Sequence, residues 1–432
     1  MKNKPMRFLA MRMLAGRKDF RGEKDLARRA LLGAIVSVAV SIIPLITVMQ
    51  VADGMIGGIT KRYVELGTYH AQLHVYGTRN LETIRDEVGL LPGVRGAWIE
   101  TQTVGVVFTG GKKEGVAVRG VEPGFIDDEG TSRYLSLAAG TLSMTRPNDA
   151  LVGTSIAEKL DLNAGDNINL ITIRRNHDGE PLPRITILRV VGVVSAGYRE
   201  LDSQWIFIRN DTARRLFQAD SSRSFIGVKI DTAAGGPDAA VGLISDKIQP
   251  GQSLYSWETL ERNLFESLSS TRTMLLLIMA VTVIVAAINV SSALMTLVLE
   301  RRQEIAVLKG LGAAPSDLAS IFSLGGAALG ALGAVLGAMG GLLASIRINE
   351  ILHILEISVN KFRTLWNGKQ VLHEEYIRVL DPGYYLETIP VDIAFPEIAV
   401  VVGLTIAVSF LAALLPARKA AEMSPLELFR RH

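Results

Sequence analysis

Four long apolar runs interrupt a chain that is otherwise rich in charge. The segments 30–52, 273–299, 318–346 and 398–417 contain no Asp, Glu, Lys or Arg and consist mainly of aliphatic residues. A helix of roughly 20 apolar residues crosses the hydrocarbon core of a bilayer, which is about 30 Å thick, and each run reaches that length. The pattern therefore predicts four transmembrane helices in an integral membrane protein.

The polar segment 53–272, between the first two runs, alternates between strand-like and helix-like patterns. Strands are expected at 71–76, 96–108, 115–121, 167–173, 185–194, 205–208 and 225–230. Helices are expected at 81–88, 155–160, 211–218, 237–248 and 257–268. This mixture predicts a large α+β domain with a mixed or antiparallel sheet, in which Gly110 and Gly111 form a hairpin turn. The last of these helices is expected to continue into the second membrane helix without a break.

Basic residues set the expected orientation. The segment 1–29 holds many Lys and Arg and few acidic residues, and positively charged flanks stay in the cytoplasm. Four crossings then place 53–272 and 347–397 outside the cell membrane, and 300–317 and 418–432 in the cytoplasm.

The segment 1–29 also shows helical periodicity. Its apolar residues share one helix face: Met6, Leu9, Ala10, Met13 and Leu14. Two interpretations stay open, a basic amphipathic helix on the inner leaflet or a tail that serves only to orient the chain.

Composition removes several classes of function. The chain has no cysteine, which excludes disulfides, thiolate catalysis and cysteine-ligated metals. A net charge of +3 gives no reason to expect binding to nucleic acid. The sequence has no GxxxxGK[ST] phosphate loop, no GxSxG elbow and no HExxH zinc motif. We expect no catalytic residue, metal or cofactor on this chain, and no ATPase site of its own.

Glycines recur at a spacing of four in the third apolar run, at 326/330, 333/337 and 337/341. Small residues at this spacing let two helix backbones approach closely in lipid. The pattern fits either fixed packing against the second or fourth membrane helix or a mobile contact that permits sliding.

The segment 300–317 is a short charged connection that is broken at Gly310 and Gly312 and restarts as a helix at Pro315. It suits either docking to a cytoplasmic partner or a plain solvated link. Residues 416–430 repeat the same character.

The polar segment 174–184 separates two strand patterns and contains two prolines. Pro181 and Pro183 are expected to block strand pairing and to hold a projecting loop extended. Such a loop is either a docking arm or a surface hairpin, and composition favours the hairpin.

Two cytoplasmic motifs carry a resemblance to a known family. ERRQEIAVLKGLGA at 300–313 and PARKAAEMSPLELFR at 416–430 resemble the motifs of type VII ABC-transporter permeases, the FtsX/MacB superfamily. Within it, VVGVVSAGYRELDS at 190–203 and the stretch with Leu386, Ile389 and Pro390 are similar to the lipoprotein-releasing permeases LolC and LolE. The motifs fit either of the two, or a hybrid of both. The resemblance implies four membrane helices and a large MacB-like periplasmic core between the first two.

The resemblance also implies a function. Such a permease extracts lipoproteins from the inner membrane and passes them to a periplasmic carrier. It works with a second permease subunit, identical or different, and a cytoplasmic ABC ATPase dimer that holds ATP and Mg²⁺. The alternatives in the superfamily are a MacB-like exporter of peptides or drugs and an FtsX-like regulator of a cell-wall hydrolase.

Three candidate sites follow. The resemblance implies an ATPase-coupling site at Glu300, Arg301, Arg302, Glu304, Lys309, Gly310 and Gly312. It also implies a carrier-docking hook at Arg174, Arg175, Asn176, Asp178, Gly179, Pro181, Pro183 and Arg184. Pulling acyl chains from a bilayer costs about 0.8 kcal/mol per CH₂, so an apolar cavity has to replace the lipid as solvent. The expected walls of this lipid and cargo cavity are Val48, Met49, Met55, Ile56, Leu264, Leu268 and Met274.

Overall fold

The computed structural model describes the chain in two compact units. The described residues are 26–76, 80–175, 180–217, 223–231, 241–242, 244–245, 248–310, 313–367, 386, 389–391 and 393–422. We call Met1–Gly54, Ser269–Leu355 and Pro390–His432 the helical unit, and Met55–Leu268 and Glu356–Ile389 the sheet unit. The segment 1–25 lies outside the described residues, and with it the expected amphipathic helix.

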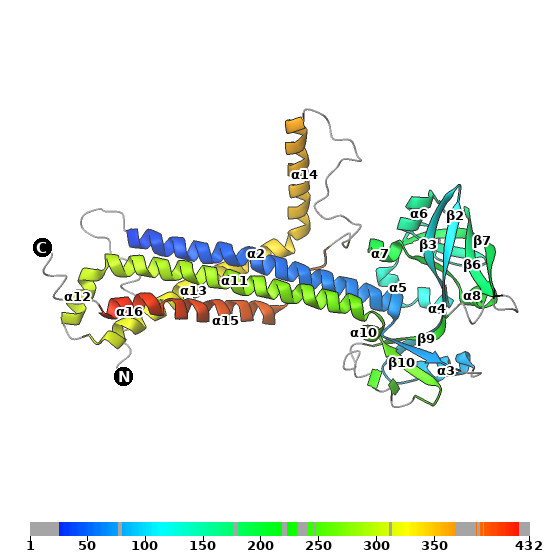
Figure 1. The fold of residues 1–432 in the computed structure, drawn as a ribbon, viewed down its shortest axis with the longest axis horizontal. Helices are drawn as coiled ribbons and strands as arrows, with labels where there is room; N and C mark the ends of the chain where they lie inside the picture. The colour runs from blue at the N-terminus through cyan, green and yellow to red at the C-terminus, as the bar shows by residue number, and fades with distance from the viewer. Residues whose placement is uncertain are drawn as a thin grey trace. The chain divides into compact units, whose positions relative to one another are not determined.

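The helical unit contains four long apolar helices, as the sequence predicts (Figure 1). They are α2 (Leu26–Arg62), α11 (Arg262–Glu300), α13 (Pro315–Ile346) and α15 (Phe395–Ala412). Two shorter helices accompany them, α12 (Arg302–Gly310) and α16 (Leu414–Glu422). A third, α14 (Ile348–Asn367), begins in the helical unit and passes into the sheet unit after Leu355. Because charged residues such as Lys61 and Arg62 form helix as readily as apolar ones, α2 and α11 extend well beyond their apolar runs. The helix α14 was not expected from the sequence.

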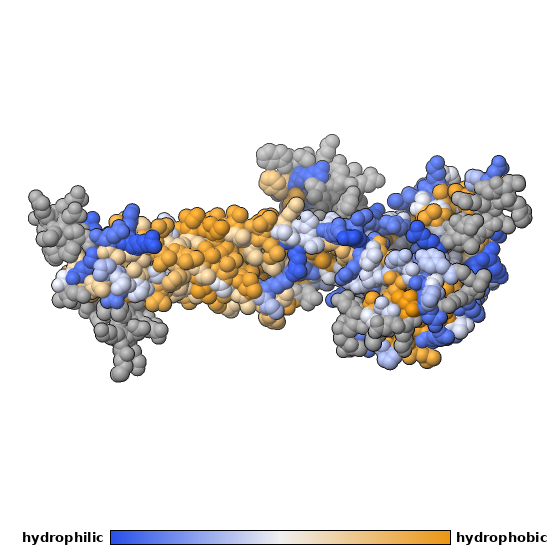
Figure 2. All heavy atoms as spheres, turned by 60° about the horizontal axis from the view of Figure 1, so that its bottom comes forward, coloured by the Kyte–Doolittle hydropathy of each residue, from blue (hydrophilic) through white to orange (hydrophobic). Residues whose placement is uncertain are grey.

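Apolar side chains cover the outside of the long helices as well as their contacts. Val40 on α2 and Val281 on α11 are exposed, as is Leu343 on α13. Figure 2 shows an almost continuous hydrophobic surface along these helices. Helices that are apolar all round are typical of membrane spans, because their outer face contacts lipid, whereas exposing it to water would be unfavourable.

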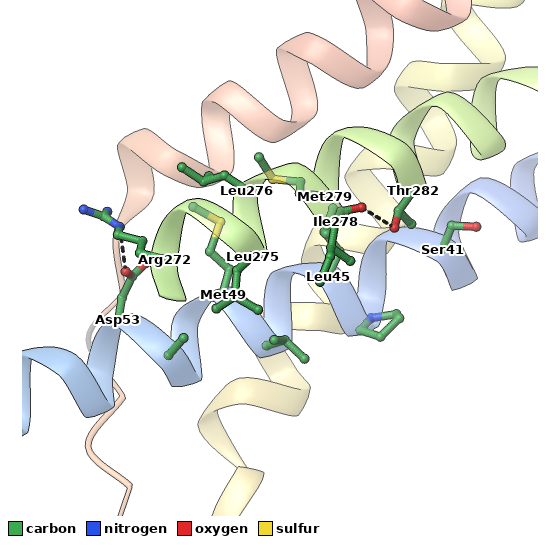
Figure 3. Close-up of a pocket in the computed structure, with 13 residues that line it drawn as sticks. Ser41, Leu45, Met49, Asp53, Arg272, Leu275, Leu276, Ile278, Met279 and Thr282 are labelled. Atoms are coloured by element: carbon green, nitrogen blue, oxygen red, sulfur yellow. Dashed lines mark hydrogen bonds and ion pairs between the residues drawn. The ribbon is translucent and has the colours of Figure 1, made fainter. Parts of the chain in front are cut away.

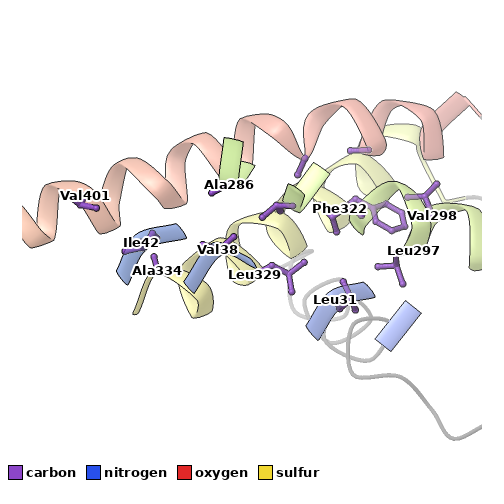
Figure 4. Close-up of a cluster of buried hydrophobic side chains, with 14 of the residues drawn as sticks. Leu31, Val38, Ile42, Ala286, Leu297, Val298, Phe322, Leu329, Ala334 and Val401 are labelled. Carbon is purple, nitrogen blue, oxygen red and sulfur yellow. The ribbon is translucent and has the colours of Figure 1, made fainter. Parts of the chain in front are cut away.

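The glycines of α13 set the packing inside the helical unit. A Cβ on Gly333, Gly337 or Gly341 would lie 2.6, 2.7 or 2.8 Å from the Cβ atoms of α2 residues Val38, Ile42 and Ile46, respectively. On another face, Gly326 and Gly330 leave room for Ala413 and Ser409 at the end of α15. The helix α13 thus packs closely against the fourth membrane helix, as the glycine pattern predicts, and also against the first, which the pattern did not suggest. Leu294 of the second lies 3.0 Å from the position of a Gly326 Cβ. Figure 4 shows Val38, Ile42, Ala334 and Leu329 in this core.

The sheet unit is built on one sheet of ten strands in the order β10-β1-β9-β2-β3-β8-β5-β7-β4, with β6 pairing to β2 and β7. The strands are β1 (Ala71–Val75), β2 (Val94–Thr109), β3 (Lys112–Val121), β4 (Ser136–Gly140), β5 (Asp149–Gly153), β6 (Asn167–Arg175), β7 (Pro181–Ser195), β8 (Trp205–Arg209), β9 (Arg223–Ile230) and β10 (Gln252–Ser256). Most pairs are antiparallel, whereas β3 with β8 and β5 with β7 are parallel. The α+β class is confirmed.

Short helices connect the strands. They are η1 (Tyr63–Thr68, a π-helix), α3 (Leu81–Gly89), α4 (Pro123–Ile126), α5 (Glu129–Tyr134), α6 (Thr154–Leu160), α7 (Arg199–Asp202), α8 (Asn210–Leu216) and α10 (Trp257–Leu260). The expected helix at 237–248 falls largely outside the described residues. The expected continuous helix at 257–268 is interrupted at one residue, because Glu261 between α10 and α11 has φ −113° and ψ 37°.

The hairpin predicted at Gly110 and Gly111 is confirmed. Both glycines join β2 to β3 with positive φ, 53° and 86°. A two-residue type I′ turn requires this conformation at both central positions, and glycine adopts it without a steric penalty.

The expectation that two prolines block strand pairing is wrong. Pro181 and Pro183 belong to β7 and lie opposite Arg175 and Ile173 of β6. In an antiparallel ladder, opposite residues alternate between hydrogen-bonded and non-hydrogen-bonded pairs, so two prolines spaced two apart fall in the same class. A non-hydrogen-bonded pair needs no N–H from either residue and therefore accepts proline. The pairing therefore extends into the segment 174–184. Asn176, Asp178 and Gly179 lie outside the described residues, and only the backbone of Arg174 and Arg175 is described.

Candidate functional site

An apolar pocket lies between α2 and α11 (Figure 3). In Figure 3, Leu45 and Met49 of α2 face Leu275 and Met279 of α11. The full lining is Ser41, Pro44, Leu45, Val48, Met49, Ala52, Asp53, Arg272, Leu275, Leu276, Ile278, Met279 and Thr282. The α2 residues recur every three or four positions, so a single helix face supplies one wall.

Polar groups sit only at the two ends of the pocket. Ser41 and Thr282 lie at one end. At the other, Arg272 Nε lies 3.1 Å from Asp53 Oδ1 and the same guanidinium pairs with Glu397 of α15. We call Asp53, Arg272 and Glu397 the charged rim. One arginine thus links three membrane helices at this end, and two carboxylates share its charge.

The pocket is small for a lipid. Its volume is about 180 Å³, and apolar cavities of roughly 150 Å³ hold one benzene-sized molecule. It therefore accommodates only a few methylene groups as it stands. A complete acyl chain would fit only if α2 and α11 moved apart.

The pocket includes two of the seven cavity residues expected from the sequence, Val48 and Met49. Met274 is 62% exposed and does not line it. Met55, Ile56, Leu264 and Leu268 belong to the sheet unit, where Leu264 packs against the apolar core. On both helices the expected wall lies nearer the sheet unit than the pocket does, because the pocket is lined mainly by residues inside the apolar runs. The sequence reasoning missed Leu45, Leu275 and Met279.

The end of α2 continues into η1, which buried ion pairs hold in the sheet unit. Arg119 of β3 is buried and donates to both oxygens of Glu100 on β2, at 2.6 and 2.8 Å. The same guanidinium donates to the carbonyl oxygens of Leu66 and Gly67 in η1. Its plane also lies over Trp205, 4.6 Å from the ring centroid. One cation therefore joins the last turn of the helix to two strands.

A second buried cation holds the same turn. Lys229 Nζ of β9 lies 2.8 Å from Asp128 and 3.3 Å from Glu65 of η1. Burial lowers the pKa of Lys229, and the hydrogen bond that Lys229 donates to Asp128 and the charge of Glu65 only partly oppose this. Burial alone would raise the pKa of Asp128, but its bonds from Lys229 and the Thr131 N–H outweigh that effect and lower it. We call these contacts of Arg119 and Lys229 the η1 network. No sequence motif signals it, because its members are far apart in the chain.

The motifs at 300–313 and 416–430 meet in the structure, as far as their described residues show. Lys309 Nζ of α12 donates to the carbonyl oxygen of Ala421 in α16, at 2.6 Å. Ile305 and Ala306 turn inward and are buried, and Ile305 joins the same core cluster as Ala417. The break expected after α12 is present, since α12 ends at Gly310 and α13 begins at Pro315. Gly312 and residues 423–432 lie outside the described part of the chain.

The other side of α12 is open. Gln303, Glu304 and Val307 are exposed, and Val307 retains 52% of its surface. We call these three the coupling surface. Glu304 also pairs with Arg301 at 2.5 Å. The sequence reasoning named Glu304 but missed Val307, whose exposure becomes visible only when Ile305 and Ala306 are seen to face inward.

In the candidate hook, Arg184 Nη1 donates to the carbonyl oxygen of Leu216, at 3.1 Å. This side chain is therefore engaged within the sheet unit. Two further segments singled out by the resemblance lie together, because Tyr198 and Leu386 form an antiparallel bridge. Within the described ranges, no cluster of three or more His, Asp or Glu could hold a metal ion.

Comparison with known proteins agrees with this architecture. The profile of the MacB-like periplasmic core domain matches residues 31–242, and that of the FtsX-like permease C-terminal domain matches 276–425. The chain is 24% identical over 406 residues to the lipoprotein-releasing system transmembrane protein LolC of Neisseria meningitidis serogroup B, covering 92% of this chain and 93% of that protein. It is 22% identical over 350 residues to LolE of Haemophilus influenzae, covering 79% and 78%.

Among solved structures, the periplasmic region of MacB from Actinobacillus actinomycetemcomitans matches with a TM-score of 0.31 and 14% identity. The match covers 46% of this chain and 93% of that one. The two profiles together span most of the sequence and divide it as the four long helices and the inserted sheet domain do. The chain is a multi-pass inner-membrane ABC-transporter permease of the FtsX-like family with a MacB-like periplasmic core domain.

Proposed function

We propose that this permease extracts lipoproteins from the inner membrane and passes them to a soluble periplasmic carrier, driven by an ATPase on another chain. Membership of the ABC permeases implies an ATPase partner and further subunits. The relatives that match over most of the chain are named for lipoprotein release. In this proposal the sheet unit is periplasmic, and α12, α16 and both termini are cytoplasmic.

The α2–α11 pocket is the observation that carries the proposal. A lipoprotein is held in the bilayer by its acyl chains, and each CH₂ that leaves lipid for water costs about 0.8 kcal/mol. Release therefore requires an apolar site within the protein, open toward the bilayer. The pocket has such a lining, and its charged rim lies at the end where the chain leads into the sheet unit.

The pocket volume indicates how ATP would be used. Because about 180 Å³ does not hold a whole acyl chain, α2 and α11 must separate to load cargo and close to expel it. The charged rim opposes separation, since parting the helices breaks the contacts of Arg272. The η1 network would carry any movement of α2 into the sheet unit, and the coupling surface of α12 would receive the ATPase.

The test is reconstitution. Proteoliposomes contain this chain, its ATPase and the second permease subunit, with a fluorescent lipoprotein in the membrane and the carrier in solution. ATP should move the lipoprotein into the soluble fraction. This chain purified alone should not hydrolyse ATP above background. Release that does not depend on ATP, or hydrolysis by the chain alone, would contradict the proposal.

A matched pair of variants ties release to the pocket. Leu275→Trp fills the pocket, whereas Leu277→Trp changes a neighbouring α11 side chain that faces outward and does not line it. We expect at least a tenfold loss of release for Leu275→Trp with ATP hydrolysis retained, and near-normal release for Leu277→Trp. Equal effects of the two variants would remove the pocket from the mechanism.

A further inference from the structure

The helix α14 begins directly where a membrane span ends. Only Arg347, with φ −100° and ψ 19°, separates it from α13. Figure 1 shows the chain leaving the line of α13 at this point. The change of direction follows from the backbone at Arg347, which departs from helical geometry.

Contacts of α13 fix the level of this bend in the membrane. Thr47 Oγ1 of α2 donates to the carbonyl oxygen of Gly341 in α13, at 3.3 Å. Six residues further along each helix lie Asp53 and Arg347. Asp53 belongs to the charged rim that closes the apolar part of the bundle. The helix α14 therefore begins at the edge of the hydrocarbon layer.

One side of α14 is apolar and exposed. Leu355, Val359 and Phe362 recur at helical spacing and keep 46%, 41% and 65% of their surface exposed. The other side carries exposed polar residues, among them Glu350, His353 and Lys361. Two exposed apolar residues, Ile354 and Ile357, interrupt that polar side. This division is typical of helices that lie in a membrane interface with one face in the acyl boundary.

The apolar face continues a surface that already meets lipid. Met339, Leu343 and Ile346 on the last turns of α13 are exposed on a helix that spans the membrane. The first exposed apolar residues of α14 follow within two turns. The lipid that contacts the last turns of α13 therefore also reaches the start of α14.

We propose that α14 lies in the surface of the membrane at the sheet-unit end of the bundle. Leu355, Val359 and Phe362 enter the acyl boundary, and Glu350, His353 and Lys361 face water. The occupant of the apolar face is the bilayer itself. This assignment does not depend on which cargo the permease carries.

The absence of native cysteine makes the test direct. Single variants of the full chain, Leu355→Cys, Phe362→Cys, His353→Cys and Lys361→Cys, are labelled with an environment-sensitive fluorophore. Each is reconstituted in vesicles of phosphatidylethanolamine and phosphatidylglycerol. Leu343→Cys on the spanning helix α13 is the lipid-facing control. All five positions are exposed, so the substitutions leave the packed core unchanged.

We expect nitroxide-labelled lipid to quench positions 355, 362 and 343 at least threefold more than 353 and 361, and aqueous iodide to show the reverse order. Equal access of iodide to all four α14 positions would overturn the proposal and leave α14 projecting into water. Protection of 355 and 362 from both quenchers, with disulfide formation between two copies, would overturn it in favour of a protein interface.

Discussion

Single residues inside the sheet unit carry charge where water cannot reach. Arg119 and Glu100 are both buried, with 1% and 0% of their surface exposed. Removing one partner of a buried ion pair leaves the other charge uncompensated, which costs about 3–5 kcal/mol. The pair also supplies donors to the η1 carbonyl oxygens, so its loss would loosen the end of α2.

We therefore expect Arg119→Met to lower the free energy of unfolding of the sheet unit by about 3–5 kcal/mol. Urea unfolding of the full chain in detergent, followed by tryptophan fluorescence, measures this, because Trp205 lies against Arg119. The control is Arg133→Met, which breaks a surface pair with Glu129 and should cost less than about 1 kcal/mol. Similar losses for both variants would show that the buried pair has no special role.

His70 gives a second prediction at this scale. Burial lowers the pKa of His70 from 6.5 to about 4; the charges of Glu65 and Asp128 oppose this shift, and those of Arg95 and Lys229 add to it. The folded chain thus keeps His70 neutral where the unfolded chain binds a proton. Stability is complete above pH 6.5 and falls between pH 6.5 and about 4, by up to about 1.4 kcal/mol per pH unit.

Unfolding free energies measured across this range should fall less steeply for His70→Gln than for the natural chain. His353→Gln, at an exposed position of α14, serves as the control and should keep the natural slope. An unchanged slope in His70→Gln would mean that His70 does not titrate as proposed.

At the scale of elements, α12 is the segment where ATP hydrolysis would enter the permease. Its coupling surface places Val307 beside Glu304, and an exposed aliphatic side chain among charges suits insertion into a partner's cleft. We expect Val307→Asp to reduce binding of the ATPase at least tenfold, measured by co-purification. Membrane insertion should stay normal, because Val307 does not belong to the buried core.

Glu304→Lys should also uncouple ATP use from transport, but it breaks the pair with Arg301 as well. Comparing the two variants separates the effects. Loss of coupling in Glu304→Lys with normal coupling in Val307→Asp would point to helix stability, and would contradict docking through the coupling surface.

The segment 176–180, which joins β6 to β7 in the sequence, gives another prediction at the scale of elements. We propose it as the hook that engages the carrier, because two paired strands support it and Arg184 is fixed to Leu216. Replacing 176–180 with a Gly-Ser turn should leave complex assembly and ATP hydrolysis intact. Lipoprotein should then fail to reach the carrier in a pull-down. Normal loading by this variant would remove the hook from the proposal.

Elements differ in how far the sequence predicts them. The four spans were predictable because a helix that crosses a bilayer needs about 20 consecutive apolar residues, whereas a helix of a soluble protein does not. The short strands β4, β5 and β10 were not, since their sequences neither alternate between apolar and polar residues nor hold more than one β-branched or aromatic residue each. The pairing of β7 was predicted wrongly because proline disrupts a ladder only where its N–H would have to donate. Positions that need no donor accept proline. The η1 network was invisible because its charged residues are far apart in the sequence and meet only in the fold.

At the scale of the whole molecule, three sites lie along a continuous chain path. The coupling surface is at one end of the membrane helices, the α2–α11 pocket is within them, and the η1 network joins α2 to the sheet. In our account, the ATPase docks at the coupling surface and the lipid anchor enters the pocket. The η1 network then moves the sheet domain, which meets the carrier. The central claim is that the pocket takes the lipid anchor.

Site-specific photo-crosslinking tests that claim most directly. A benzophenone amino acid is placed at Met49 in the pocket or, as control, at Leu277 on the outward face of α11. The complex is reconstituted with a lipoprotein whose acyl chains are radiolabelled. The account predicts a labelled adduct at Met49 that does not form when ATP and carrier are added before irradiation, with little labelling at Leu277. Equal labelling at both positions, unaffected by ATP, would contradict it.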